Sequence, residues 1–377
     1  MGGNGATGRP EENIVTYPRM KPRIGVLTSG GDCPGLNAVL RGVVLAAEKL
    51  GWEVIGFRDG FEGLLPPGDY VILDRKCTEN IMALGGTMIG TTNRGHFVSK
   101  VAAGDRAVVA SEVIEKARRV LQEARVNALI IVGGDGSMTT ALQLQEAGIN
   151  CVGVPKTIDN DLEATAMTFG FDSAVAAVMD ALDRLHTTAT SHKRAIVVEV
   201  MGRHAGWIAL HGGLAGGADI ILIPEIPFDF DKVAEAIRTR DAAGNLSSLV
   251  VVAEGARPQD GQQVKREMKE GEFRLGGIGD IVAREIAART GKETRTCVLG
   301  HLQRGGAPTT LDRILGTRFG VKAVQLINEG HFGTMVSYQN YQCRHVPIAD
   351  AVNRLRLVPP NGEMVQTARD VEVTFGD

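Results

Sequence analysis

Several common sequence signals are weak or missing in this chain of 377 residues. Aromatic residues make up only 5% of it and the formal net charge is −3, so the composition does not point to nucleic acid or a membrane surface as a partner. No apolar stretch is long enough to span a membrane, and residues 1–22 lack the apolar centre of a secretory signal. We therefore expect a cytoplasmic protein with a disordered leader over residues 1–22.

Cysteines are few, and none of their spacings is typical of a metal site. The chain has five cysteines, at positions 33, 77, 151, 297 and 343. Because they show neither a zinc-binding pattern nor the density of a small disulfide-rich domain, we expect reduced thiols.

Two familiar nucleotide-binding fingerprints are also absent. After the apolar run 23–28, residues 29–35 are Ser-Gly-Gly-Asp-Cys-Pro-Gly, which fits neither the dinucleotide fingerprint nor the Walker loop with its terminal Lys-Ser/Thr. Apolar residues then recur at helical spacing from Leu36 to Leu50, and Pro34 can begin a helix. The glycines would lie at the positive end of that helix, so we predict a phosphate cradle of another kind.

The most informative stretch is Pro-Lys-Thr-Ile-Asp-Asn-Asp over residues 155–161, directly after the apolar run 151–154. If that run is a strand, an extended tripeptide aims Asp159 and Asp161 to one side of a loop at its carboxyl end, where open α/β sheets bind ligands. One carboxylate could take the proton from an attacking hydroxyl, and the other could hold a metal or raise its neighbour's pKa. The alternative is a turn rich in Asp and Asn.

A second acidic loop lies upstream of the first. The five apolar residues 128–132 show no alternation and suit a strand buried on both faces, and the apolar spacing beyond residue 140 predicts a helix. Three glycines surround Asp135 in the loop 133–137, which suits a backbone that approaches a bulky anion. A simple turn between strand and helix is the alternative.

The rest of the chain continues to alternate between predicted strands and helices, which indicates parallel sheets covered by helices. Residues 174–185 have one apolar helical face, and residues 256–277 look like an inserted surface excursion. The predicted buried strands are 195–200, 219–224, 248–254 and 294–299.

These loops resemble those of the phosphofructokinase family, and five further motifs match in the family's order. The motifs cover residues 191–194, 199–206, 253–255, 293–295 and 298–306. The resemblance runs from about residue 23 to about 353. It implies an α/β protein with two doubly wound, mostly parallel-sheet domains and an active site in the cleft between them. The implied nucleotide domain is 23–170 with 304–350, and the implied sugar-phosphate domain is 171–303 with 351–377.

By this resemblance the chain transfers the γ-phosphoryl group of ATP to the 1-hydroxyl of fructose 6-phosphate, with Mg²⁺ as cofactor. Asp159 is the implied general base, and Asp135 with Asp161 the implied Mg²⁺ ligands. The other implied catalytic groups are Thr157, Arg203 and the backbone amide of Gly31.

The resemblance also implies two sets of binding residues. Those for the nucleotide are Gly31, Phe61, Arg94, Asp135, Gly136 and Ser137. Those for the sugar phosphate are Thr157, Asp159, Asp161, Arg194, Met201, Gly202, Arg203, Glu254, Arg295, His301 and Arg304. In the family, Arg194 and Arg295 serve the neighbouring subunit's site, which implies a homodimer or homotetramer.

Two positions bear on the phosphoryl donor and point in different directions. Members that use pyrophosphate have Asp where this chain has Gly136, and that carboxylate would repel the α-phosphate of ATP. The same members have the lysine found here as Lys156. Because this chain lacks the repelling carboxylate at position 136, we expect ATP as the donor, with pyrophosphate as the alternative. Lipid or NAD kinases and a non-catalytic regulatory subunit are the remote alternatives; the latter would be expected to have lost Asp135, Asp159 or Arg203.

Overall fold

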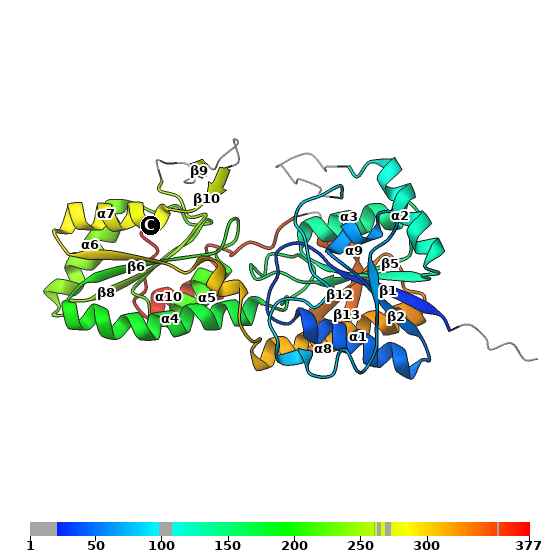
Figure 1. The fold of residues 1–377 in the computed structure, drawn as a ribbon. Coiled ribbons are helices and arrows are strands. Elements are labelled where there is room, and N and C mark those ends of the chain that lie inside the picture. Colours follow the sequence, from blue (N-terminus) through cyan, green and yellow to red (C-terminus); the bar gives the residue numbers. More distant parts are fainter. Residues whose placement is uncertain (1–20, 98–107, 260, 262–264, 268–272, 353) are drawn as a thin grey trace, which may run out of the picture.

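The computed structural model of the chain describes residues 21–97, 108–259, 261, 265–267, 273–352 and 354–377 (Figure 1). The predicted disordered leader falls almost wholly outside the described residues. No helix in the described part of the chain combines the length and the apolar character needed to cross a membrane.

The larger of two parallel-rich sheets has seven strands in the order β13-β12-β5-β4-β1-β2-β3 (Figure 1). The five inner strands run parallel, and an antiparallel strand closes each edge. The strands are β1 (Arg23–Thr28), β2 (Glu53–Phe57), β3 (Tyr70–Leu73), β4 (Ala128–Gly133), β5 (Cys151–Pro155), β12 (Thr334–Gln339) and β13 (Gln342–Pro347). Because β1, β4 and β5 are side by side, their carboxyl ends bring the loops at 29, 134 and 156 together.

Helices cover both faces of this sheet (Figure 1). On one face α1 packs closely against α8, since a side chain at Gly42 would approach the Thr317 carbonyl oxygen to 2.6 Å. On the other face lie α2, α3 and α9. The helices are α1 (Leu36–Lys49), α2 (Ser111–Glu123), α3 (Asp135–Glu146), α8 (Thr310–Asn328) and α9 (Ile348–Ala351), with the 3₁₀ turns η1 (Gly60–Leu64) and η2 (Ile81–Ala83).

The smaller sheet has four parallel strands in the order β11-β6-β8-β7. Helices α6 and α7 lie on one face, and α4, α5 and α10 lie on the other (Figure 1). The strands are β6 (Ala195–Val200), β7 (Ile220–Leu222), β8 (Ser248–Ala253) and β11 (Thr294–Val298). The helices are α4 (Phe171–His192), α5 (Trp207–Ala215), α6 (Phe230–Ala242), α7 (Ile278–Thr290) and α10 (Glu363–Asp370), with the 3₁₀ turn η3 (Gly300–Arg304).

Two parallel-rich sheets with helices on both faces confirm the predicted α/β class. One detail was wrong: β11 was expected to be buried, but its residues are half-buried or exposed, and Val298 is 52% exposed. The reason is its position, because β11 is an edge strand that pairs only with β6. A predicted strand does not by its own sequence show whether it lies at the edge or in the centre of a sheet.

The chain passes between the sheets more than once. It leaves the larger sheet after β5 and returns to it through η3 and α8. The C-terminal tail then goes back to the smaller sheet, where the Ile221 amide donates to the Thr374 carbonyl at 3.0 Å. This path agrees with two discontinuous domains, although their boundaries stay a proposal. The described residues of segment 256–277 lie outside both sheets and include the antiparallel pair β9 (Lys265–Glu267) and β10 (Phe273–Leu275).

Candidate active site

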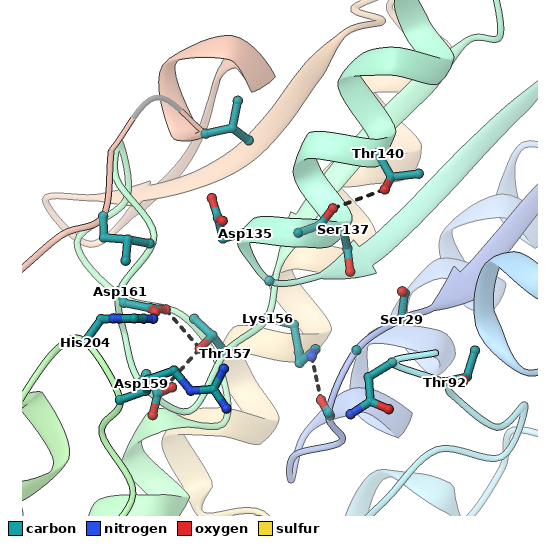
Figure 2. Close-up of a pocket in the computed structure, with 18 of the residues that line it drawn as sticks. Ser29, Thr92, Asp135, Ser137, Thr140, Lys156, Thr157, Asp159, Asp161 and His204 are labelled. Atoms are coloured by element: carbon teal, nitrogen blue, oxygen red, sulfur yellow. Dashed lines mark hydrogen bonds between the residues drawn. The ribbon is translucent and has the colours of Figure 1, made fainter. Parts of the chain in front are cut away.

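A cavity of about 550 Å³ opens where the carboxyl ends of the two sheets approach each other. The loops after β1, β4 and β5 form its walls on the side of the larger sheet. The segments after β6 and β8 contribute Arg203, His204 and Glu254 from the smaller sheet. Figure 2 shows the carboxylates of Asp135, Asp159 and Asp161 in this cavity.

The loop after β4 differs from its expected form because α3 begins at Asp135 itself. Asp135, Gly136 and Ser137 therefore form the first helical turn, where backbone N–H groups without helical partners point outward and favour anions. Burial raises the pKa of Asp135 to about 6, with the nearby Asp161 carboxylate adding to the rise. This helix end can therefore receive a phosphate, while its first side chain supplies a carboxylate.

The loop after β5 is not the extended tripeptide that the sequence suggested. Asn160 adopts a left-handed conformation with φ of 51°, and its side-chain oxygen accepts a hydrogen bond from the Thr168 amide at 3.0 Å. The Thr157 hydroxyl donates to Asp161 at 3.1 Å and accepts from the Asp159 amide at 3.1 Å. A tight turn stabilised by threonine and asparagine, rather than strand geometry, thus sets the positions of both carboxylates (Figure 2).

Asp159 is a strongly perturbed carboxylate in the cavity. Burial and, to a smaller extent, the Asp161 carboxylate raise its pKa to about 7, although the Arg304 and Arg203 guanidinium groups act in the opposite direction. Its Oδ1 atom is buried and has no hydrogen-bond partner among the described residues. An unpartnered carboxylate oxygen with a pKa near neutrality has the properties of a general base that awaits a hydroxyl group.

Asp135 and Asp161 form a pair that could hold a divalent cation. Burial raises the pKa of both carboxylates, and the Asp161 carboxylate adds to the rise at Asp135. No group of three or more His, Cys, Asp or Glu side chains suited to a metal occurs in the described parts of the chain. Mg²⁺ is commonly held by one or two carboxylates together with phosphate oxygens and water, so two carboxylates fit this ion.

Arg304 brings a positive charge against the glycine loop that follows β1. Its Nη1 atom donates to the Asp32 carbonyl at 3.1 Å. A Cβ atom at Gly31 would lie 2.9 Å from the same Nη1 atom, so a side chain there would push the Arg304 guanidinium aside. Arg203 also lines the cavity. Anionic groups that enter the cavity would therefore meet the two guanidinium groups opposite the carboxylates.

Lys156 is buried between the first and third loops. Its ammonium group donates to the Gly31 carbonyl at 2.5 Å, as the dashed line in Figure 2 shows, and burial lowers its pKa. The side chain lines the cavity, but its charge is directed to the backbone of the glycine loop. In this state Lys156 orders the loop.

An aromatic pair lines part of the cavity. The Phe61 ring stacks on the Phe97 ring with centroids 5.4 Å apart, and both side chains are buried. Arg94 and Ser137 line the same cavity. The sequence pointed to Phe61, but it offered no signal for Phe97, which lies far along the chain and reaches this place only through folding.

Five of the residues expected at the site do not line this cavity. They are Arg194, Met201, Gly202, Arg295 and His301. Arg194 and Arg295 instead form ion pairs with Glu293 at 2.9 and 2.6 Å, at the start of the edge strand β11. The lining residues that were not predicted include two basic side chains, His204 and Arg354. His204 belongs to the matched motif 199–206, which was a usable signal, whereas nothing in the sequence marked Arg354.

Comparison with known proteins supplies an independent assignment of the family. A sequence profile described as Phosphofructokinase matches residues 23–327. The ATP-dependent 6-phosphofructokinase of Chloroflexus aggregans is 52% identical over 95% of this chain and 98% of its own. The pyrophosphate–fructose 6-phosphate 1-phosphotransferase of Amycolatopsis methanolica is 49% identical over 94% of this chain and 100% of its own.

A solved structure shows the same fold. The crystal structure of Pichia pastoris phosphofructokinase in the T-state is similar with a TM-score of 0.78 and 30% sequence identity. The match covers 94% of this chain, which spans 37% of the longer yeast chain.

Proposed function

The chain belongs to the phosphofructokinase family, and we propose that it transfers the γ-phosphoryl group of ATP to the 1-hydroxyl of fructose 6-phosphate. The products are ADP and fructose 1,6-bisphosphate. Asp159 takes the proton from the 1-hydroxyl as this oxygen attacks the γ-phosphorus atom and the bond to the β-phosphate oxygen breaks. Phosphoryl transfer requires mainly that the protein position the reacting groups and stabilise their charge, which the cavity can do.

One observation carries this proposal: the buried Asp159 carboxylate has an unpartnered oxygen in a cavity where acidic and basic groups meet. Arg203 and Thr157 would stabilise the migrating phosphoryl group, and the Gly31 amide would contact the terminal phosphates. Mg²⁺, held by Asp135 and Asp161, would neutralise charge on the phosphate chain.

ATP is the proposed donor for two reasons. The stacked rings of Phe61 and Phe97 give the cavity an aromatic wall, which a nucleotide base can use and a pyrophosphate cannot. Gly136 adds no carboxylate beside the phosphates. Because Lys156 is engaged with the Gly31 carbonyl, its presence is a weaker argument for pyrophosphate than the sequence suggested.

The sugar-phosphate side is proposed to need a second copy of the chain. Glu254 and Arg304 line the cavity and would contact the sugar, with Met201, Gly202 and His301 nearby in the matched motifs. Arg194 and Arg295 lie outside the cavity of their own chain. We therefore propose that they complete the site of a neighbouring subunit in a homodimer or homotetramer.

The test is a pair of parallel assays on the purified protein with fructose 6-phosphate and Mg²⁺, one with ATP and one with pyrophosphate. The proposal expects fructose 1,6-bisphosphate to form rapidly with ATP and slowly or not at all with pyrophosphate. A rate with pyrophosphate alone would contradict the donor assignment while supporting the reaction class. No product with either donor would contradict the whole proposal.

Pyrophosphate remains the second candidate because Lys156 matches the pyrophosphate-dependent members, and a relative named for that donor is 49% identical. Lys156→Gly separates the two cases. If Lys156 only orders the glycine loop, the variant loses activity with whichever donor is used. If Lys156 neutralises a leaving phosphate, the loss is confined to pyrophosphate.

A further inference from the structure

The segment 354–358, which follows α9, crosses the loop that carries the candidate base. Leu355 pairs with Leu162 as an antiparallel bridge, and the Arg356 amide donates to the Asp161 carbonyl at 2.9 Å. The Arg356 guanidinium also reaches the Asn160 carbonyl, with Nη1 3.4 Å from its oxygen. Both carbonyls belong to the tight turn that sets the positions of Asp159 and Asp161.

The same segment is attached to the smaller sheet. The Arg356 guanidinium lies over the Trp207 ring, with its carbon 4.6 Å from the ring centroid, and the Trp207 Nε1–H donates to the Arg356 carbonyl at 2.9 Å. Trp207 is the first residue of α5 and is only 8% exposed. Arg356 therefore contacts the turn of Asp159 and Asp161 through its backbone amide and its guanidinium N–H. It contacts α5 through the face of the guanidinium and through its backbone carbonyl.

A half-buried glutamate, Glu225, makes a second attachment to the same place. Glu225 accepts hydrogen bonds from the Gly206 amide at 3.0 Å and from the Val358 amide at 2.8 Å. Gly206 lies three residues after Arg203, at the start of α5. Segment 354–358 thus links the turn of Asp159 and Asp161 to the loop that carries Arg203, the candidate phosphoryl-binding residue.

We propose that Arg356 is a positioning residue, which fixes the turn of Asp159 and Asp161 relative to Arg203. The proposal rests on the phosphotransferase function proposed above and names a residue that acts through the catalytic groups rather than on the substrate. Left-handed Asn160 is a conformation that the surroundings must stabilise, and Arg356 holds its carbonyl. A shift of about 1 Å in a catalytic group can lower a rate by about a hundredfold.

The test compares Arg356→Met with a matched control, Arg369→Met. Arg369 likewise lies over an aromatic ring, 5.1 Å from the Phe375 centroid, but it is in α10 and pairs with Asp377. For Arg356→Met we expect kcat to fall about ten- to a hundredfold, with KM for both substrates within about threefold of the parent. Arg369→Met should keep the kcat of the parent, and Arg356→Lys should recover part of the loss because it retains the charge.

Hydrogen–deuterium exchange provides a readout independent of turnover. Amides of residues 157–168 should exchange faster in Arg356→Met than in the parent or in Arg369→Met. Equal kcat in Arg356→Met and the parent, or unchanged exchange, would overturn the proposal, as would parallel losses in both arginine variants.

If Arg356→Met does not fold, Arg356→Lys and Trp207→Phe carry the same test. Trp207→Phe removes the indole donor and keeps a ring under the guanidinium. If the parent turns over with neither donor, the proposed function fails, and the exchange experiment still decides whether Arg356 orders the turn.

Discussion

The acidic and basic sides of the cavity differ in how far the folding of one chain removes their charged groups from water. On the side of the larger sheet, the carboxylates of Asp159 and Asp161 are buried. The Thr157 hydroxyl donates to the Asp161 carboxylate and accepts from the Asp159 backbone amide. On the side of the smaller sheet, Arg194 and Arg295 share Glu293 at an edge strand, and the Arg295 side chain is 59% exposed. The acidic side is desolvated when the chain folds, whereas Arg295 keeps much of its water until another molecule covers it.

This difference separates two tasks. A base with a raised pKa must be removed from water in advance, and folding supplies the energy for that. A cation that binds a phosphate can stay hydrated until the ligand arrives, and it can come from a neighbouring protomer. Variants on the acidic side should therefore lower turnover within one chain, and variants at β11 should reveal dependence on a second chain.

The largest expected effect is that of Asp159→Asn. Without a proton acceptor, kcat should fall about 10²- to 10⁴-fold, while the affinity for fructose 6-phosphate stays close to that of the parent. Steady-state kinetics and calorimetric titration with the sugar phosphate measure the two quantities. Asp183→Asn, at an exposed position of α4, is the matched control. Turnover that survives in Asp159→Asn would assign the base to another group.

Gly136→Asp should have the next largest effect. A second carboxylate beside Asp135 places like charges next to the donor phosphates, so kcat/KM for ATP should fall about a hundredfold. Gly136→Asn adds nearly the same volume without the charge and should lose much less. Initial rates with both donors measure the change. If Asn lowers the ATP rate as much as Asp does, crowding rather than charge decides the donor.

Mixing two inactive variants tests the basic side. Asp159→Asn and Arg295→Ala should each be nearly inactive alone, but subunits exchanged at equal amounts should regain about a quarter of the parent activity if Arg295 serves the neighbouring site. Half of the dimers are then mixed, and each mixed dimer has one intact site. Activity is measured before and after exchange. No recovery, although mixed dimers form, would place Arg295 in the site of its own chain.

The smallest expected effect concerns stability. Asp312 in α8 accepts hydrogen bonds from the Ser173 amide at 2.8 Å and hydroxyl at 2.6 Å, which joins it to α4. Burial raises its pKa from 3.8 to about 6. Its charged form is therefore disfavoured in the folded chain, so its protonation stabilises the protein below pH 4, and this contribution is lost as the pH rises through 6.

Asp312→Asn should remove this pH dependence of the free energy of unfolding, which amounts to at most about 3 kcal/mol. Relative to the variant, the parent should be more stable at pH 5 than at pH 8, and Tm measured at both values checks this. Asp183→Asn should show the same pH dependence as the parent. Parallel Tm curves for Asp312→Asn and the parent would contradict the assignment.

Local chemistry in the sequence determined much of this protein. Unbroken apolar runs located strands such as β5 and β6, and the glycines and aspartates that follow β1, β4 and β5 located the loops of the cavity, because strand burial and turn formation depend on neighbouring residues. The ordered motifs that carry the family resemblance lie in these same local stretches.

Tertiary structure alone decided which distant residues meet. It placed Phe97 on Phe61, Lys156 on the Gly31 carbonyl and Arg356 on the turn of Asp161, and it made β11 an edge strand. These contacts join residues tens to hundreds of positions apart, so they depend on how sheets and helices pack and leave no periodic trace along the chain. The pKa of Asp159 has the same origin, because it follows from burial and neighbouring charges that exist only in the folded protein.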